Sequence, residues 1–244
     1  MNNDSYDVSA RLKDLRNQSE RRYMHTESGF LNEEELAEAS VHFPESALVR
    51  YDGGYPGARK KKVIFLRDEE DDFSDIVCIG AKADQRFRSI GHRDILGSIM
   101  SLQIDRHSIG DLWIDGDRIY IYTSHAMADF LCAHLLRIGR LPVSFEVLPD
   151  RPAQVFKTRE FEAVVSSERI DSLVAVLAKV SRTEAQRMVR QERVQVNHRT
   201  LVDTAELCDN DSTISIRGTG RFTYRGVLRR TRKDRIVVGF SQDI

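Results

Sequence analysis

The chain has 244 residues with 41% hydrophobic and 31% charged side chains, a composition that allows folded cores and excludes wholesale disorder. Its longest stretches without Asp, Glu, Lys or Arg, residues 95–104 and 119–128, have half the roughly 20 residues that a membrane-spanning helix needs, so no membrane partner is expected. The three cysteines, Cys78, Cys132 and Cys208, lie far apart and in no paired spacing. This predicts reduced thiols in a cytoplasmic protein, and neither a disulfide framework nor a zinc site.

The net charge of −1 conceals two different parts of the chain. Residues 168–244 contain 15 Lys and Arg against 10 Asp and Glu, whereas residues 1–167 contain 22 against 28. Within the basic part, residues 217–235 carry eight cations and a single acid. Such a stripe on an otherwise acidic chain indicates a polyanionic partner, most often nucleic acid; the alternative is a solvated face with internal ion pairs.

Residues 1–75 are predicted to form a small N-terminal α/β domain. Residues 4–26 have a faint helical stripe, and a second helix is expected to open at Asn32, where Asn32 and Glu35 form a capping box. A turn-rich loop over 51–62 ends in four consecutive cations and leads into the apolar strand 63–66.

Residues 76–150 are predicted to form a central domain. The pattern predicts strands at 76–83, 111–115, 118–123 and 143–148 and helices at 94–102 and 126–138, with a tight turn at 115–117 and Gly139 ending the second helix. The order β-α-β-β-α-β is that of the split βαβ plait, which RNA-recognition domains use to stack bases on aromatic residues. Tyr120 and Tyr122 share a face of a central strand, yet such spacing is more typical of half-buried sheet residues than of a base platform.

Residues 151–167 are predicted as a connector, with a strand at 161–165, and residues 168–244 as a third domain. A helix is expected from Arg169, and Ser181 with Glu184 forms the capping box of a second helix. The fold class is therefore α+β and multidomain: an N-terminal α/β region, a central RRM-like βαββαβ plait and a C-terminal domain. The remaining predicted strands lie at 194–196, 213–217, 223–230 and 235–240, the last two forming a basic hairpin with its turn at 231–234.

Four ordered motifs of the C-terminal part resemble the S-four domain, a small RNA-binding module named after small-subunit ribosomal protein four. They are Arg169-Ile-Asp171, Ser181-Arg-Thr-Glu-Ala185, Val194-Gln-Val-Asn197 and Gly218-Thr-Gly-Arg-Phe222. In that family the second helix and the following turn lie against structured RNA, and arginine forks and helix N-terminal amides suit phosphate groups. The resemblance implies an S-four-type RNA-binding domain with these contact residues: Arg169, Ser181, Arg182, Thr183, Gln186, Arg187, Arg190, Arg193, Asn197, Arg199, Gly218, Gly220 and Arg221.

Two positions depart from the S-four pattern. Glycine is usual where this chain has Glu192 and His198. Glu192 stands at a helix end that favours a left-handed backbone, and it adds a negative charge beside the predicted RNA surface.

Four upstream motifs resemble the YlmH family of bacterial and plastid-type S-four proteins. They are Gly53-Gly-Tyr-Pro-Gly-Ala-Arg59, His92-Arg-Asp-Ile-Leu-Gly-Ser-Ile-Met-Ser-Leu102, Ile109-Gly-Asp-Leu-Trp-Ile114 and Ile138-Gly-Arg-Leu-Pro-Val143. The resemblance, which covers residues 30–240, implies a protein without catalytic activity or cofactor that binds 23S-type rRNA and peptidyl-tRNA on the large ribosomal subunit. Such proteins support rescue of stalled chains in ribosome-associated quality control. A monomer is expected away from the ribosome.

A second RNA contact is predicted upstream of the S-four motifs. Arg59, Lys60, Lys61 and Lys62 are adjacent cations, which repel one another unless an anion binds them; the alternative is a solvated loop. The pair His92 and Arg93 stands at the start of a helix, where capping explains these residues as well as RNA contact does.

The alternative function is an RNA-modifying enzyme of pseudouridine synthase type, since those enzymes also carry an S-four module. They place the module ahead of a catalytic domain with a Gly-Arg-Leu-Asp motif, whereas here it is C-terminal and residues 1–167 lack that motif. His92-Arg-Asp94 has the letters of a kinase catalytic loop, but Ile99 stands where that loop needs asparagine. No catalytic residue and no metal ligand is predicted.

Overall fold

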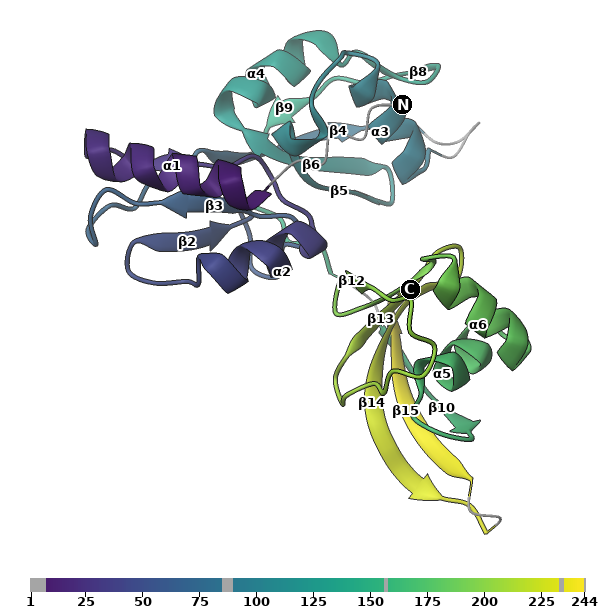
Figure 1. Ribbon diagram of the computed structural model, residues 1–244. Coiled ribbons are helices and arrows are strands. Elements are labelled where there is room, and N and C mark those ends of the chain that lie inside the picture. The colour runs from purple at the N-terminus through teal and green to yellow at the C-terminus, as the bar shows by residue number, and fades with distance from the viewer. Residues whose placement is uncertain (1–7, 85–89, 156–157, 233–234, 244) are drawn as a thin grey trace. The chain divides into compact units, whose positions relative to one another are not determined.

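The computed structural model describes residues 8–84, 90–155, 158–232 and 235–243, and the chain forms two compact units, residues 1–154 and 155–244 (Figure 1). Helices and antiparallel sheets occur in both units, which confirms the α+β class. The three cysteines are free thiols. Within the described ranges, no helix combines the length and apolar character needed to cross a bilayer, and no three His, Cys, Asp or Glu side chains converge as a metal site requires.

The first part of unit 1–154 packs two helices against a three-stranded antiparallel sheet of order β1-β3-β2. The predicted capping box is present: the Asn32 side-chain oxygen accepts from the amides of Glu34 and Glu35, and the Glu35 carboxylate accepts from the Asn32 amide at 2.7 Å. These bonds fix the start of the second helix. The elements are α1 (Val8–Arg22), β1 (Thr26–Glu27), α2 (Glu33–His42), β2 (Val49–Asp52) and β3 (Lys62–Phe65).

The second part of this unit, which we call the plait, is a four-stranded antiparallel sheet of order β5-β6-β4-β9. Its helices cover one face, where Ile95 and Ile99 of α3 and Leu131 of α4 join Val77 and Ile79 in one core. The predicted tight turn is present at Gly116, which has a φ of +58°. The elements are β4 (Ile76–Lys82), α3 (His92–Met100), the 3-10 helix η1 (Arg106–Ser108), β5 (Ile109–Asp115), β6 (Arg118–Ser124), α4 (His125–His134) and β9 (Glu146–Val147).

Two predicted elements of the plait are shorter in the structure. Helix α4 ends at His134, and β7 (Arg137–Ile138) then pairs with β8 (Leu141–Pro142) around a two-residue turn. Gly139, with a φ of +58°, serves this hairpin turn, so its predicted role as a helix end is wrong. Ile138 is buried in the plait core, which is why the apolar pattern continues past the helix. The strand predicted at 143–148 is reduced to β9.

The face of the plait opposite the helices is covered in part by the preceding chain. Tyr122 is completely buried there, with ring centroids 5.9 Å from Trp113 and 4.8 Å from Tyr55. Phe30 belongs to the same aromatic cluster. Tyr122 is therefore a core residue and is not available to a base, whereas Tyr120 at the edge of the cluster stays partly exposed.

Unit 155–244 is a six-stranded antiparallel sheet of order β10-β15-β14-β13-β11-β12 that shares one core with helices α5 and α6. Residues 158–165 lie within the predicted connector but form β10, which pairs with β15 along its whole length. The predicted basic hairpin is present, although residues 233–234 of its turn lie outside the described residues. The elements are β10 (Thr158–Val165), α5 (Ile170–Leu177), α6 (Arg182–Arg190), β11 (Val194–Val196), β12 (Arg199–Thr200), β13 (Thr213–Ile216), β14 (Gly220–Arg230) and β15 (Ile236–Asp243).

Candidate nucleic-acid interface

The start of α6 places the first of the predicted RNA-contacting residues. Ser181 is the N-cap, and its hydroxyl accepts from the Glu184 amide at 3.2 Å. The reciprocal half of the predicted capping box is wrong, because the Glu184 carboxylate accepts instead from the Arg187 guanidinium at 2.8 and 3.0 Å. Arg182 and Thr183 lie exposed in the first turn, where free helix amides favour an anion.

A buried carboxylate organises the arginines beside this helix. Asp171 of α5 is completely buried and accepts two hydrogen bonds from Arg182, at 3.0 and 3.1 Å, and two from Arg169, both at 3.3 Å. Gln186 donates a further bond at 2.8 Å. Burial alone would raise the pKa of Asp171, but the hydrogen bonds from Arg182, Gln186 and Arg169 outweigh it and lower that pKa to about 2. The carboxylate therefore stays ionised and orients two guanidinium groups.

The positive charge of this cluster is reduced by Asp171 but not cancelled. Two guanidinium groups share one carboxylate, and the side chains of Arg182 and Arg169 remain 47% and 36% exposed. Gln186, predicted as an RNA contact, uses its amide to support Asp171. The sequence left two alternatives for the basic residues: ion pairs within the protein or a cationic surface for RNA. At this cluster both occur together.

Three further arginines of the predicted set lie at the surface. Arg187 is 63% exposed and pairs with Glu184, and Arg190 is exposed with no ion-pair partner among the residues described. Arg199 is exposed and pairs with Glu206. Ion pairs on a surface add little because water competes for both partners, so a phosphate can replace either carboxylate.

The backbone after α6 takes the left-handed turn that the sequence predicts at Glu192. This residue has a φ of +57°, its amide donates to the Val189 carbonyl at 2.9 Å, and the Arg193 amide donates to the Met188 carbonyl at 3.0 Å. These bonds form a Schellman motif, whose left-handed position favours glycine. His198 also has a positive φ, of +66°. Both departures from the S-four pattern are therefore at positions where the backbone suits glycine.

Replacing Glu192 by glycine is expected to raise the free energy of unfolding by about 0.5–1 kcal/mol, because relief of the Cβ clash exceeds the extra unfolded-state entropy of glycine. It should also tighten RNA binding by removing a negative charge. Urea denaturation of the full chain measures the first effect. Glu192→Ala is the matched control, since it removes the charge but keeps the Cβ atom. Equal stability of the two variants would contradict the strain argument.

The remaining predicted contacts cluster around the start of β14. Arg193 donates to the Arg217 carbonyl at 3.1 Å, beside Gly218, which has a φ of +86°. Gly220 has a φ of +139°, and Arg221 is half-buried. Asn197 accepts from the Thr213 amide at 2.9 Å, so this side chain joins its turn to the start of β13. The structure thus brings Arg193 and the glycine loop together and gives Asn197 a structural bond.

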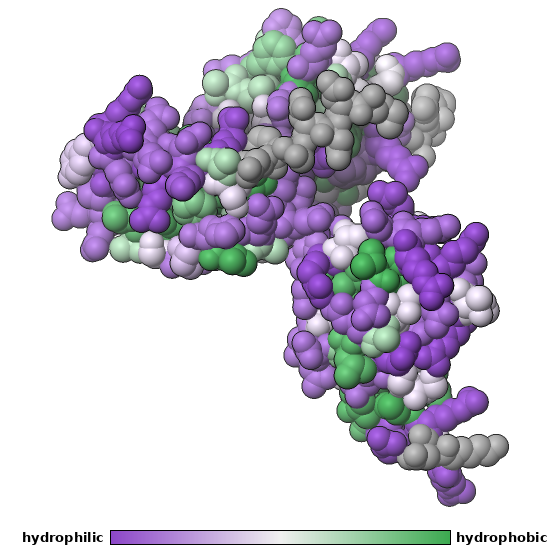
Figure 2. Space-filling view, in the orientation of Figure 1, coloured by the Kyte–Doolittle hydropathy of each residue, from purple (hydrophilic) through white to green (hydrophobic). Residues whose placement is uncertain are grey.

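The basic hairpin supplies cations that lie outside the predicted contact set. Arg230 and Arg232 are exposed near its end, while Arg225 pairs with Asp211 and Arg229 with Glu162. Figure 2 shows hydrophilic side chains over most of the visible face of this unit, with smaller patches of hydrophobic ones between them. The run of cations at residues 217–235 in the sequence could have added these arginines to the predicted contact set.

The predicted second contact contains cations that the fold uses internally. Lys62 is only 4% exposed, pairs with Glu27 and lies 5.3 Å from the centre of the Phe30 ring. The prediction that Lys62 contacts a phosphate is therefore wrong, because its ammonium group is buried. Lys60 donates to the Ile109 carbonyl at 3.0 Å, and burial lowers its pKa.

The other members of the second contact stay closer to the surface. Buried Asp111 accepts from the backbone amides of Arg59, at 2.7 Å, and Lys60, at 3.1 Å, which fixes the loop that carries them. Lys61 is half-buried beside them. His92 and Arg93 lie in the first turn of α3, where the imidazole of His92 is partly withdrawn from water. This partial burial and the charge of Lys60 lower the pKa of His92. The structure therefore brings His92 near the basic loop.

Most of the chain has recognisable relatives. Residues 68–151 match the family described as "Putative RNA-binding domain in YlmH". Over 198 residues the chain is 29% identical to "Ribosome-associated protein quality control protein P2" of Bacillus subtilis (strain 168), a match that spans 79% of this chain and 77% of that protein. The solved structure of "Cell division protein ylmH from Streptococcus pneumoniae" aligns with a TM-score of 0.49 and 18% identity over 61% of this chain and 93% of that chain. The match at 68–151 agrees with the resemblance to the YlmH family that the sequence motifs indicate.

Proposed function

We propose that this chain is a non-enzymatic factor that binds structured RNA on the large ribosomal subunit and takes part in the rescue of stalled peptidyl-tRNA complexes. The description of the matched domain and the name of the Bacillus relative support an RNA-binding, ribosome-related role. Unit 155–244 is the proposed S-four-type surface for 23S-type rRNA and peptidyl-tRNA. The protein acts in the cytoplasm, without a cofactor, and is a monomer until it meets the ribosome.

The cluster centred on Asp171 is the observation that carries this proposal. An ionised carboxylate buried in α5 holds Arg169 and Arg182 while leaving both side chains partly exposed. Pre-oriented guanidinium groups lose less conformational freedom when they bind phosphate, so they suit a folded RNA with fixed phosphate positions. Arg187 and Arg190 extend the cationic surface along α6.

Sedimentation with purified ribosomal subunits tests the proposal. The full chain should co-sediment with large subunits, more strongly when they carry peptidyl-tRNA, and should stay at the top of the gradient with small subunits. Equal retention by both subunits would remove the large-subunit assignment. No retention by either would reject ribosome binding.

A non-enzymatic role is tested independently of binding. Structured RNA labelled at uridine and incubated with the full chain should be recovered with every uridine unchanged. An enzyme of pseudouridine synthase type would convert some of them. Any conversion above a heat-inactivated control would therefore reject the non-enzymatic role.

A further inference from the structure

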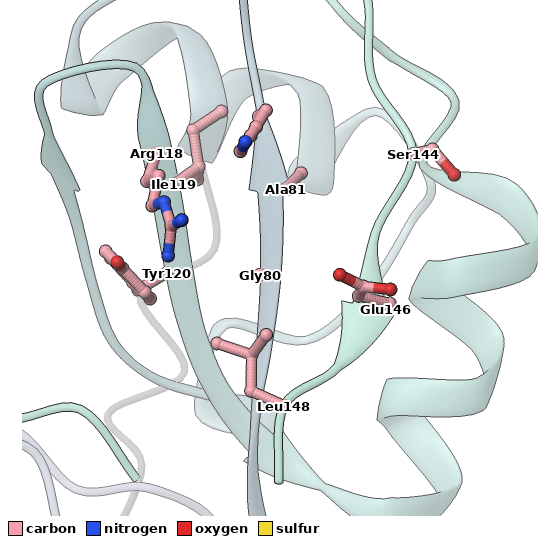
Figure 3. Close-up of a pocket in the computed structure, with 9 residues that line it drawn as sticks. Gly80, Ala81, Arg118, Ile119, Tyr120, Ser144, Glu146 and Leu148 are labelled. Atoms are coloured by element: carbon pink, nitrogen blue, oxygen red, sulfur yellow. The ribbon is translucent and has the colours of Figure 1, made fainter. Parts of the chain in front are cut away.

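Two grooves of unit 1–154 have similar volumes, about 400 and 360 Å³, but differ in their linings. Figure 3 shows the first, on the plait sheet, where the Leu148 side chain occupies the space over Gly80. A ligand there would have to displace this leucine. The second, which we call the α1 groove, lies between residues 16–20 of α1, residues 43–49 and residues 65–69, and it is the better candidate for a ligand.

The α1 groove has an apolar floor and an apolar wall. Phe43, Val49, Phe65 and Leu66 line it and are buried. Leu48 also lines it and is 45% exposed, and its carbonyl accepts from the Leu66 amide at 3.0 Å, which joins two of the lining segments. A half-exposed leucine beside buried apolar side chains is covered with a gain in free energy when an apolar group enters. The lining therefore favours an apolar occupant.

The polar side chains that α1 contributes to the lining are paired within the protein. The buried Ser19 hydroxyl donates to the Met24 carbonyl at 2.7 Å, and Arg16 pairs with Glu20 at 3.0 Å. Sites for small molecules combine an apolar lining with a few converging polar groups that fix the orientation of the ligand. The α1 groove instead suits one apolar side chain carried by a larger partner.

The rim of the α1 groove is acidic. Residues 68–72 are five consecutive acids, and Glu69 among them lines the groove. Glu69 and Glu70 are exposed and have no ion-pair partner within the ranges that the structure describes. Arg50 donates to Asp72 at 2.8 Å, which ties the acidic segment to β2. Exposed carboxylates held beside the groove attract a cationic partner and repel RNA.

We propose that the α1 groove binds a basic peptide segment of a protein partner, with one large aliphatic side chain in the groove and flanking Lys or Arg residues beside Glu69 and Glu70. The apolar lining selects for a side chain that a simple polycation lacks, and the acidic rim selects against an acidic or neutral peptide. This inference goes beyond the proposed function, since it gives unit 1–154 a protein contact of its own.

Binding of a fluorescein-labelled peptide, Gly-Lys-Lys-Leu-Lys-Lys-Gly, to the full chain tests the site by fluorescence anisotropy. The anisotropy should rise and saturate as protein is added. A peptide with serine in place of leucine should bind at least about tenfold more weakly, because it has no apolar side chain to bury. A peptide with glutamine in place of each lysine should also bind more weakly, and its affinity should no longer depend on salt. Equal affinity of the leucine and serine peptides would overturn the site.

A substitution in the wall of the groove tests the apolar contact from the side of the protein. Leu48→Ser should weaken binding of the leucine peptide at least about fivefold. Val41→Ser is the matched control, because Val41 is an apolar residue of α2 that is 76% exposed and lies outside the groove; affinity should stay within about twofold. Both side chains are exposed, so neither change removes a core residue. Affinity unchanged by Leu48→Ser would contradict the proposal.

The acidic rim is tested by a pair of charge changes. Glu69→Gln with Glu70→Gln should weaken binding of the leucine peptide about threefold or more at low salt, and this difference should shrink as salt is added. Asp129→Asn with Glu160→Gln removes two exposed acids outside the groove and should leave affinity within about twofold. Equal losses in the two double variants would reduce the effect to net charge and reject the assigned rim.

Sedimentation velocity of the full chain without peptide examines a second copy as the occupant. The wild type and Leu48→Ser should both sediment as monomers. Self-association of the wild type that is lost in Leu48→Ser would assign the groove to a second copy and overturn the peptide proposal.

The peptide proposal and the proposed RNA-binding function fail separately. Leu48→Ser should leave binding of structured rRNA within about twofold, because Leu48 and the α6 arginines belong to different units. Loss of peptide binding in this variant, with structured rRNA still bound, supports the groove. Peptide binding by a chain that no ribosomal subunit retains would support the groove and reject the proposed function alone.

Discussion

Exchanging Arg187 and Arg190 together for glutamate is expected to weaken binding of structured rRNA by the full chain at least about 100-fold near 0.1 M salt, since charge-assisted contacts are lost and repulsion is gained. Both side chains are exposed on α6, so the loss would not reflect a damaged core. Two lost phosphate contacts should also lower the slope of log affinity against log salt by about 1.4–1.8. Filter binding over a salt series measures both quantities.

The matched control places the same charge change on the other unit. Lys13→Glu with Arg16→Glu alters two exposed cations of α1 and should leave rRNA affinity within about threefold, because neither cation belongs to the proposed RNA surface. If the α6 variant binds as tightly as the wild type, the interface lies elsewhere on the chain. The hairpin arginines would then be the next surface to test.

Asp171→Asn is expected to destabilise unit 155–244 by about 3 kcal/mol, because the buried site keeps its cationic donors and loses the charge that balances them. RNA binding should weaken as well, since Arg169 and Arg182 lose their fixed orientation. Urea unfolding of the full chain offers an internal control: Trp113 fluorescence follows unit 1–154 and should be unchanged, whereas far-UV circular dichroism should show an earlier transition. Coincident transitions in variant and wild type would contradict this role of Asp171.

The pKa of Asp171 gives the same carboxylate a pH signature. Its pKa is about 2 in the folded chain and about 3.9 in an unfolded one, so the unfolded state takes up the proton first as pH falls. The stabilisation is complete above about pH 5, declines below about pH 4 and is lost as pH falls through about 2, a total of about 2 kcal/mol. The stability of the Asn variant should vary less over this range. If the stability of the wild type and of the Asn variant changed equally with pH, Asp171 would not be the group responsible.

Helix caps and turns of this fold could be predicted, because the residues that form each of them are close in sequence. The capping box of Asn32 and Glu35 spans three residues, and the left-handed turn at Glu192 follows from its place at a helix end. The hairpin of β7 and β8 could not, since its apolar residues continue the helical pattern of α4 and only packing against the plait core separates them.

In the candidate site, too, features set by neighbouring residues could be predicted, and features set by distant residues could not. Arg182 of α6 follows from a motif, but its orientation depends on Asp171, which it meets only because α5 packs against α6. Lys62 belongs to a run of cations that indicates a phosphate contact, yet it pairs with Glu27, 35 residues earlier in the chain. Contacts between distant residues decide which charges face outward, and charge patterns alone do not contain them.

The aromatic cluster shared by the first strands and the plait limits how the molecule can be divided. A fragment trimmed to the family match at 68–151 would lack Phe30 and Tyr55 and would uncover Tyr122 and Trp113. Each large aromatic side chain buries about 150–250 Å² in a core, and an apolar patch of that size in water promotes aggregation. Fragments made to express the plait should therefore begin before α1. Among related sequences, a substitution at Tyr55 should be accompanied by changes at Trp113 or Tyr122.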